Sequence, residues 1–309
     1  MSPPARTAGF VGLGVMGSAM SGHLLASGYR VVGYDIDPTR LAEHEARGGE
    51  AAGSAAEVAT RVAEATSPPD PARGGAIVTS LPSTRALEEV AAEIAVPGTV
   101  VVETSTLPLA ARFAARDALA ARDVTLLDCP LSGTGAQART KDIAVYVSGD
   151  DAAAKERALP VLEAFTRSRH DAGPFGNGTR LKIVANLLVA VHSLAAAEAL
   201  LLARRLGLDA DEALAALTDG AGDSRMLRVR GPMMISGAYR DPAAAMMRIE
   251  LFLKDLGIIA EAAAGAGSPV PLLEESAAHY TAAAARGRGD LDVAGVLAEL
   301  EAGERPDHP

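Results

Sequence analysis

The stretch that most constrains the fold is a long apolar run from Gly176 to Arg205, GNGTRLKIVANLLVAVHSLAAAEALLLARR. Glycines at its start permit a sharp turn, and its closing arginines with Gly207 are typical of a helix C-terminus. At about 1.5 Å per residue, such a helix would be about 40 Å long. Because so long and so apolar a helix must pack against more than one body, we predict that it joins two domains.

A membrane span is the alternative, since about 20 apolar residues can cross a bilayer. The run contains Asn186, His192 and Glu198, and such polar groups are costly inside a membrane. The net charge of -10 and the lack of a basic tract also disfavour an anionic membrane surface or a nucleic acid. We therefore expect no membrane and no nucleic-acid partner.

Cysteine content and the N-terminal segment indicate the cellular setting. The single cysteine, Cys129, excludes an internal disulfide. The segment MSPPARTAGF lacks the charged and apolar regions of a signal peptide. We expect a cytoplasmic protein, and we expect no metal site.

A dinucleotide-binding motif stands near the start of the chain. Residues 8–12 predict a short strand, which runs into GLGVMG and then into an amphipathic helix. In this arrangement the first glycine permits a tight turn, the second lets the backbone approach a pyrophosphate, and the third lets the helix pack against the strand. The pyrophosphate would lie against the free N–H groups of the helix N-terminus. The expected cofactor contacts are Gly12, Leu13, Gly14, Val15, Met16 and Gly17.

Asp35 ends the next strand pattern, YRVVGYD. An acid at this place accepts hydrogen bonds from the adenosine ribose hydroxyls and repels a 2′-phosphate. Ile36 offers no cation, although Arg40 lies near enough in sequence to leave a phosphate site open. We expect NAD as the cofactor, with NADP possible.

Strand and helix patterns alternate through residue 175, which predicts an α/β Rossmann domain with a doubly wound parallel sheet. Residues 142–147 alternate and predict an added antiparallel strand, and the Pro- and Gly-rich residues 66–75 predict a surface loop. Only helical patterns follow the long helix, at 210–217, 243–264, 272–285 and 293–301. The predicted domains are an NAD(P)-binding domain at 1–175 and, at 176–309, the interdomain helix with an all-α substrate and oligomerisation domain.

Three polar clusters follow predicted strands, and ligands of parallel sheets bind beyond the carboxyl ends of strands. Two clusters, LPS and TST, would border the cofactor through Leu81, Pro82, Ser105 and Thr106. The third, DCPLSGTG, offers a serine hydroxyl and glycine N–H groups that suit a carboxylate. We expect a small carboxylic-acid substrate at Ser132, Gly133 and Thr134.

Lys182 and Asn186 lie four residues apart on the long helix and therefore share a face. Among 29 Lys and Arg, the lysines are only Lys141, Lys155, Lys182 and Lys254. Where arginine serves nearly everywhere, a lysine suggests an amine that can lose its proton once its pKa is lowered. We expect Lys182 and Asn186 to be catalytic, Lys254 to have a site role, and Arg225 to bind a second anionic group.

These residues resemble the β-hydroxyacid dehydrogenase family over about residues 8 to 300. The matching stretches are GFVGLGVMG, TSLPS, ETSTLP, DCPLSGTGAQA, KIVAN and KDL. The resemblance implies reversible oxidation of a small β-hydroxy acid with NAD(P), and a homodimer or homotetramer. It also implies that Lys182 is the general acid/base, that Asn186 orients the substrate, and that Ser132 and Gly133 bind its carboxylate. Lys254, Leu81, Pro82 and Ser105 match cofactor contacts.

The chain departs from the family pattern at three places. Thr134 replaces a glycine, Ala185 precedes Asn186 where the family has a second Asn, and Glu103 replaces an Asp. The first change would crowd or rewire the substrate pocket. Two alternatives remain: an imine reductase-like enzyme, whose members lack the lysine at this position, and a non-catalytic NAD-binding regulator.

Overall fold

The computed structural model describes residues 6–66 and 74–303. The chain divides into two compact units, 1–182 and 183–309. The division falls inside the long helix α8 (Asn177–Arg205), whereas the division expected from the sequence places the whole helix in the second domain. Most of the predicted loop at 66–75 lies outside the described residues.

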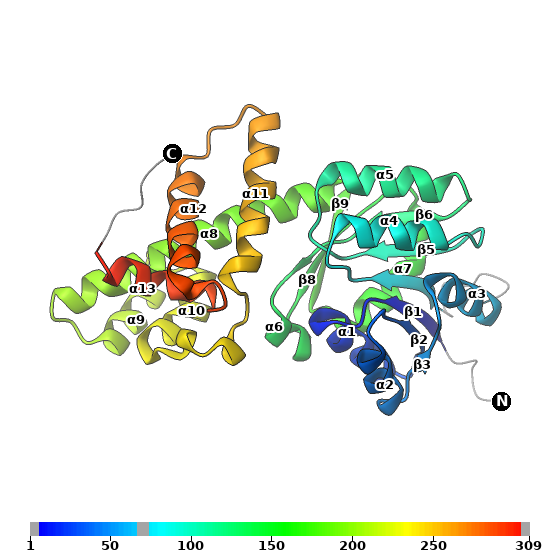
Figure 1. Cartoon of the computed structure of the whole chain (residues 1–309), viewed down its shortest axis with the longest axis horizontal. Helices are drawn as coiled ribbons and strands as arrows, with labels where there is room; N and C mark the ends of the chain where they lie inside the picture. Colours follow the sequence, from blue (N-terminus) through cyan, green and yellow to red (C-terminus); the bar gives the residue numbers. More distant parts are fainter. Residues whose placement is uncertain (1–5, 67–73, 304–309) are drawn as a thin grey trace. The chain divides into compact units, whose positions relative to one another are not determined.

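A sheet of nine strands forms the centre of the first unit, in the order β3-β2-β1-β4-β5-β6-β8-β7 with β9 against β8 (Figure 1). Strands β1 to β6 pair in parallel, which is the predicted doubly wound arrangement. The predicted added strand is β8, antiparallel to β6 and β7. The strands are β1 (Thr7–Val11), β2 (Arg30–Tyr34), β3 (Glu50–Ala51), β4 (Gly74–Thr79), β5 (Val100–Glu103), β6 (Thr125–Asp128), β7 (Leu131–Ser132), β8 (Ala144–Ser148) and β9 (Ser168–Gly173).

Helices cover both faces of this sheet and bury an apolar core on each. Met20 of α1 and Phe165 of α7 belong to one core; Val58 of α3, Leu87 of α4 and Leu119 of α5 belong to the other. The strands are apolar on both faces for this reason. The helices are α1 (Val15–Ala26), α2 (Pro38–Ala46), α3 (Ala55–Ala65), α4 (Thr84–Glu93), α5 (Leu109–Ala120), α6 (Gly135–Arg139) and α7 (Ala152–Phe165).

The sequence did not indicate β7, α6 or β9. The first two elements are too short to produce a periodic pattern. Strand β9, SRHDAG, is polar and largely solvent-facing, so it shows no apolar alternation. It exists because its backbone pairs with β8.

The second unit is helical, with one isolated β-bridge among its described residues, Arg248 to Asp292. A predicted helix at 243–264 was wrong at its start, because α11 begins only at Ile249. The Asp292 carboxylate accepts the N–H groups of Met246 and Met247 at 2.9 and 3.0 Å, so these N–H groups are bonded outside any helix. Helix α10 was not predicted. The elements are α9 (Ala210–Asp219), α10 (Arg225–Ser236), η2 (Ala238–Arg240), η3 (Pro242–Ala244), α11 (Ile249–Gly265), α12 (Pro271–Ala283), η4 (Ala284–Arg288), η5 (Val293–Gly295) and α13 (Val296–Glu301).

Helix α8 is the one described helix that is long and apolar enough to cross a membrane, by length and composition alone. Core helices of soluble proteins meet the same criterion. Ala190, Ala197 and Leu200 of α8 are buried in the apolar core of the second unit. Their burial accounts for the apolar residues on one side of the helix without a bilayer.

His44 gives the first unit a pH-dependent stability. Its ring is 3 % exposed, its Nε2 lies 3.2 Å from the Val31 carbonyl, and burial lowers its pKa from 6.5. Glycines make room for it, since a Cβ on Gly33 or Gly49 would lie 2.7 or 2.2 Å from the ring. Below the ordinary pKa the unfolded chain takes up a proton that the folded chain resists, so acid favours unfolding.

We therefore expect the free energy of unfolding to fall as the pH drops from 7 through 6.5 toward 5. A His44→Gln variant should lose part of this dependence, while the exposed His170→Gln control keeps it. Urea denaturation at several pH values measures the difference. Equal pH dependence in the wild type and both variants would contradict the assignment.

Candidate active site

The glycines of the GLGVMG loop fit the place of a dinucleotide pyrophosphate. Gly12 has φ +90°, and a Cβ there would lie 2.2 Å from the Ser80 carbonyl oxygen. A Cβ on Gly17 would lie 1.9 Å from the Gly12 carbonyl oxygen. At Gly14, by contrast, the nearest atom to an added Cβ is Arg40 Nη1 at 3.7 Å. Gly14 therefore has no steric conflict with an added Cβ, and it lies at the N-terminus of α1, where a phosphate can approach the backbone.

Asp35 connects this loop to the end of β2. Its carboxylate is 6 % exposed and accepts the N–H of Leu13 at 2.6 Å and that of Asp37 at 2.9 Å. Arg40 Nη1 lies 3.4 Å from the same carboxylate. Asp35 therefore holds the glycine loop in place and carries a negative charge beside it.

Four more predicted cofactor contacts, Leu81, Pro82, Ser105 and Thr106, lie after the ends of β4 and β5. The Leu81 N–H donates to the Ser105 hydroxyl at 2.7 Å, and Ser80 N–H donates to the Val11 carbonyl at 2.9 Å. A Cβ on Gly12 would lie 3.4 Å from a Leu81 methyl group. The carboxyl ends of β1, β4 and β5 thus bring the glycine loop, Leu81 and Ser105 together, and Pro82 and Thr106 follow directly in sequence.

The predicted carboxylate-binding element lies against the glycine loop. Ser132 ends β7, and Gly133 has φ +146° with an added Cβ 2.5 Å from Ile143. Thr134 is the N-cap of α6, in a capping box with Gln137: the Thr134 N–H donates to Gln137 Oε1 at 3.0 Å. A Cβ on Gly135 would lie 2.5 Å from Val15, so α6 begins beside α1.

The Thr134 side chain is therefore engaged in starting a helix. Its hydroxyl accepts the Gln137 N–H at 3.4 Å, an interaction that a glycine could not make. Threonine at this position caps α6, which begins directly after Ser132 and Gly133.

Lys182 lies about one turn after the start of α8 and is 8 % exposed. The start of this helix is fixed by Asp128, which accepts the Thr179 N–H at 2.8 Å and the Thr179 hydroxyl at 2.7 Å. The sequence placed Asp128 in a polar cluster but did not indicate this role. The feature of the sequence that could have indicated this role is a carboxylate placed at the end of an apolar strand.

In the second unit, Asn186 is buried and donates through Nδ2 to Asp255 Oδ2 at 3.0 Å. Lys254 Nζ lies 3.9 Å from Asp255 Oδ1, so Asp255 brings Asn186 and Lys254 to the same place. The sequence pattern indicated Asn186 and Lys254, but it gave no sign that Asp255 orients the Asn186 amide. Arg225 begins α10 and is exposed.

Two other kinds of chemistry find no support among the described residues. Cys129 is fully buried, and burial raises the pKa of its thiol, so it is not an activated nucleophile. No group of three or more His, Cys, Asp or Glu in the described ranges could hold a metal ion.

The fold and the glycine loop define a Rossmann oxidoreductase that uses NAD(P). Residues 7–173 match the NAD-binding domain of 6-phosphogluconate dehydrogenase. Residues 176–300 match the NAD-binding domain of NADP-dependent 3-hydroxyisobutyrate dehydrogenase. The chain belongs to the β-hydroxyacid dehydrogenase family.

Similar proteins act on small hydroxy acids. L-threonate dehydrogenase of Cupriavidus necator is 30% identical, over 95% of both chains. NAD-dependent L-serine dehydrogenase of Pseudomonas aeruginosa is 34% identical, over 85% of this chain and 87% of its own. The crystal structure of 3-hydroxyisobutyrate dehydrogenase from Salmonella typhimurium matches with a TM-score of 0.80 and 31% identity, over 95% of this chain and 99% of its own.

Imine reductases are more distant. One from a Pseudomonas species has a TM-score of 0.58 at 16% identity, over 96% of this chain and 99% of its own. At that identity the likeness shows a common fold.

The glycine loop generates a prediction that separates folding from cofactor binding. Gly14→Ala should fold normally, because the added Cβ meets only Arg40 Nη1, at an ordinary contact distance of 3.7 Å. It should weaken NADH binding by about tenfold or more by occupying the phosphate position. Gly17→Ala should destabilise the domain, because its Cβ would clash with the Gly12 backbone. Thermal melts and fluorescence titration with NADH measure the two effects.

Gly22→Ala is the matched control. Gly22 lies on α1, the helix that follows Gly14, and no atom outside the helix backbone lies within 4 Å of its added Cβ. It should bind NADH as the wild type does and be slightly more stable, because alanine favours helix. If Gly14→Ala bound NADH as well as Gly22→Ala does, the pyrophosphate would not lie at Gly14.

Proposed function

We propose that this chain reversibly oxidises a small β-hydroxy acid to the semialdehyde or keto acid, with NAD as the preferred cofactor and Lys182 as general acid/base. The observation that carries the proposal is a buried lysine, 8 % exposed, near the anchored start of α8, in the unit that contains the dinucleotide loop. When bound, the nicotinamide supplies a hydride acceptor.

Oxidation of an alcohol also requires a base for the hydroxyl proton. Lys182 is proposed to take that proton in oxidation and to return it in reduction. A lysine can do so where burial disfavours its charged form, and arginine cannot. Its short distance from a fixed helix start limits the positions that its amine can reach.

Substrate orientation is assigned to four further residues. Ser132 and Gly133 are proposed to bind the carboxylate through a hydroxyl and a backbone N–H, with the turn held by the Thr134 cap. Asn186, oriented by Asp255 at 3.0 Å, is proposed to hold the substrate hydroxyl. Arg225 is proposed to bind a second anionic group if the substrate has one.

The substrate class is supported by the relatives. Those described above are named for threonate, serine and 3-hydroxyisobutyrate, which are small acids that carry a hydroxyl group. We propose a substrate of three to five carbons with one carboxylate.

We further propose a soluble, cytoplasmic homodimer or homotetramer. Leu181, Val184 and Leu188 of α8 are 43%, 58% and 47% exposed, and their spacing places them on one face of the helix. A second copy of the chain that covered this stripe would remove apolar surface from water.

The main prediction concerns Lys182. Lys182→Met should lower kcat with β-hydroxy acids by about 10² to 10⁴, the usual effect of losing a proton-transfer group, while NADH affinity changes little. NAD reduction, followed by absorbance with a panel of three- to five-carbon acids, measures kcat.

Lys155→Met is the matched control, since it makes the same substitution at a lysine outside the candidate site. Lys155 bonds Asp171 at 2.9 Å and the Gly173 carbonyl at 3.0 Å. It should retain most activity. Near-normal turnover in folded Lys182→Met would contradict the proposed mechanism. Wild-type NADH binding without turnover of any acid would favour a regulator, or an imine reductase if imines were reduced.

Cofactor choice is tested at Asp35. Asp35→Asn keeps an oxygen for the Leu13 N–H but removes the charge that disfavours a 2′-phosphate, and it leaves Arg40 without a carboxylate at 3.4 Å. The ratio of kcat/KM for NADP to that for NAD should rise by about tenfold or more, which corresponds to about 1.4 kcal/mol.

Asp37→Asn is the control, because it removes the same charge from a more exposed carboxylate that also faces Arg40, at 3.5 Å. Its cofactor ratio should change much less. Equal ratios in the two variants would show that Asp35 does not select the cofactor.

A further inference from the structure

Three charged side chains, Glu103, Arg112 and Asp128, are completely buried in the first unit. Glu103 ends β5, Asp128 ends β6, and Arg112 lies on α5. Arg112 Nη1 lies 2.7 Å from Asp128 Oδ1, and Nη2 lies 3.7 Å from Glu103 Oε1. Because buried charges are costly unless they are paired and hydrogen-bonded, the contacts around these three side chains must be extensive.

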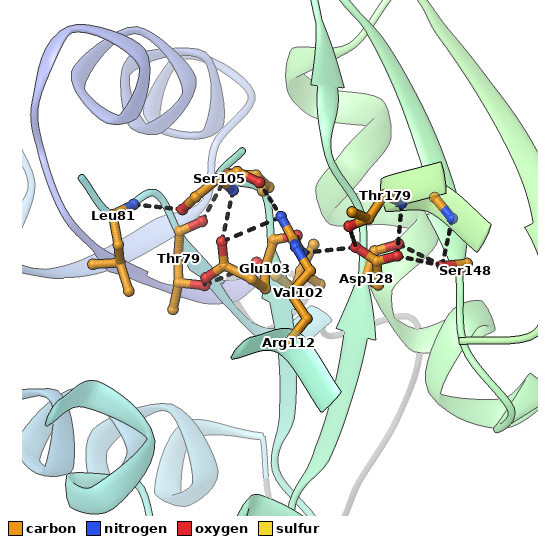
Figure 2. Close-up of polar contacts among 11 residues, drawn as sticks. Thr79, Leu81, Val102, Glu103, Ser105, Arg112, Asp128, Ser148 and Thr179 are labelled. Carbon is orange, nitrogen blue, oxygen red and sulfur yellow. Dashed lines mark hydrogen bonds and ion pairs between the residues drawn. The ribbon is translucent and has the colours of Figure 1, made fainter. Parts of the chain in front are cut away.

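On one side, the contacts extend to the cofactor loops (Figure 2). Glu103 accepts the Ser105 N–H at 2.6 Å and a hydrogen bond from the Thr79 hydroxyl. The Ser105 hydroxyl in turn accepts the Leu81 N–H at 2.7 Å. Arg112 also donates to the carbonyl oxygens of Glu103, at 3.2 Å, and Ser105. The loops after β4 and β5 are therefore held by Glu103 and Arg112 together.

On the other side, the contacts extend to the first turn of α8 (Figure 2). Asp128 accepts both the N–H and the hydroxyl of Thr179, and the Ser148 hydroxyl donates to Asp128 Oδ2 at 3.0 Å. Ser148 also accepts the Gly178 N–H at 2.9 Å. The first N–H groups of a helix have no partner within the helix, so Asp128 and Ser148 satisfy them from the sheet.

The approach of α8 to the sheet is close at this point. A Cβ on Gly178 would lie 2.6 Å from the Asp128 carbonyl oxygen and 2.7 Å from that of Tyr146. Neither the height nor the rotation of the first turn can vary much under these contacts. Lys182 lies three residues after Thr179 on the same helix, so these contacts also constrain the position of its backbone.

We propose that Asp128 and Thr179 are positioning residues for Lys182, and that Arg112 joins them to the cofactor loops through Glu103. This inference rests on the proposed function for Lys182. In this proposal, the buried chain of contacts fixes the position of the proton-transfer amine relative to the loops that border the cofactor. Neither Asp128 nor Thr179 takes part in proton transfer itself.

The test uses Thr179, because its substitution leaves the buried charges paired. Thr179→Val removes only the hydroxyl bond to Asp128, and Thr179→Ser restores it. With the wild type active, we expect Thr179→Val to lower kcat by about 10- to 100-fold, with the Kd for NADH and the substrate KM within about twofold. Thr179→Ser should recover most of the loss.

Thr166→Val is the matched control. Thr166 is also buried, and its hydroxyl donates to the Leu162 carbonyl at 2.7 Å, away from α8. It loses one buried hydroxyl bond and should keep a kcat near that of the wild type. Equal kcat values in Thr179→Val and Thr166→Val would overturn the proposal, as would failure of Thr179→Ser to recover activity.

A second readout separates this proposal from the proposed function. If the wild type turned over no hydroxy acid, the proposed function would fail, and hydrogen exchange of residues 178–185 would decide the positioning. Faster exchange there in Thr179→Val than in Thr166→Val would support a helix start fixed by Asp128. Equal exchange in both variants would overturn it.

Discussion

The ion cluster around Arg112 is the interaction on which the first unit most depends. It crosslinks two neighbouring strands, helix α5 and the start of α8, which are distant in sequence. A guanidinium is suited to this position because it remains charged when buried and presents several donors in a fixed plane. Removal of one member would leave an uncompensated buried charge, at a cost of about 3–5 kcal/mol. The same contacts that stabilise the sheet therefore also place the loops after β4 and β5, which we propose border the cofactor.

Buried carboxylates also organise the helical unit. Asp292, fully buried, bonds Arg230 at 3.3 Å and takes the backbone N–H groups of Met246, Met247 and Ala294. Asp255 orients Asn186 in the same manner. In both units a buried carboxylate fixes backbone or side-chain groups that no regular element satisfies. These acids order the parts of the chain where secondary structure ends.

Much of the fold could be predicted from sequence, because the main elements produce strong local patterns. The apolar strands, the glycine loop and α8 can each be recognised from the periodicity or composition of their own residues. The predictions were wrong or incomplete where an element depends on contacts with residues far away in the sequence. Helix α11 begins at Ile249 because a side chain 46 residues away from Met246 takes its N–H, and polar β9 forms only because β8 offers a free edge.

The sequence by itself determined the fold class, the family and the type of most candidate site residues, because motif spacing and residue chemistry are local properties. The tertiary structure decided how those residues are held. It showed that Thr134 caps a helix, that Asp35 fastens the glycine loop, and that Asp128 fixes the start of the helix that carries Lys182. Such roles depend on hydrogen bonds between segments far apart in the chain, as between Asp128 and Thr179, and no pattern along the sequence specifies which donor a buried carboxylate will meet.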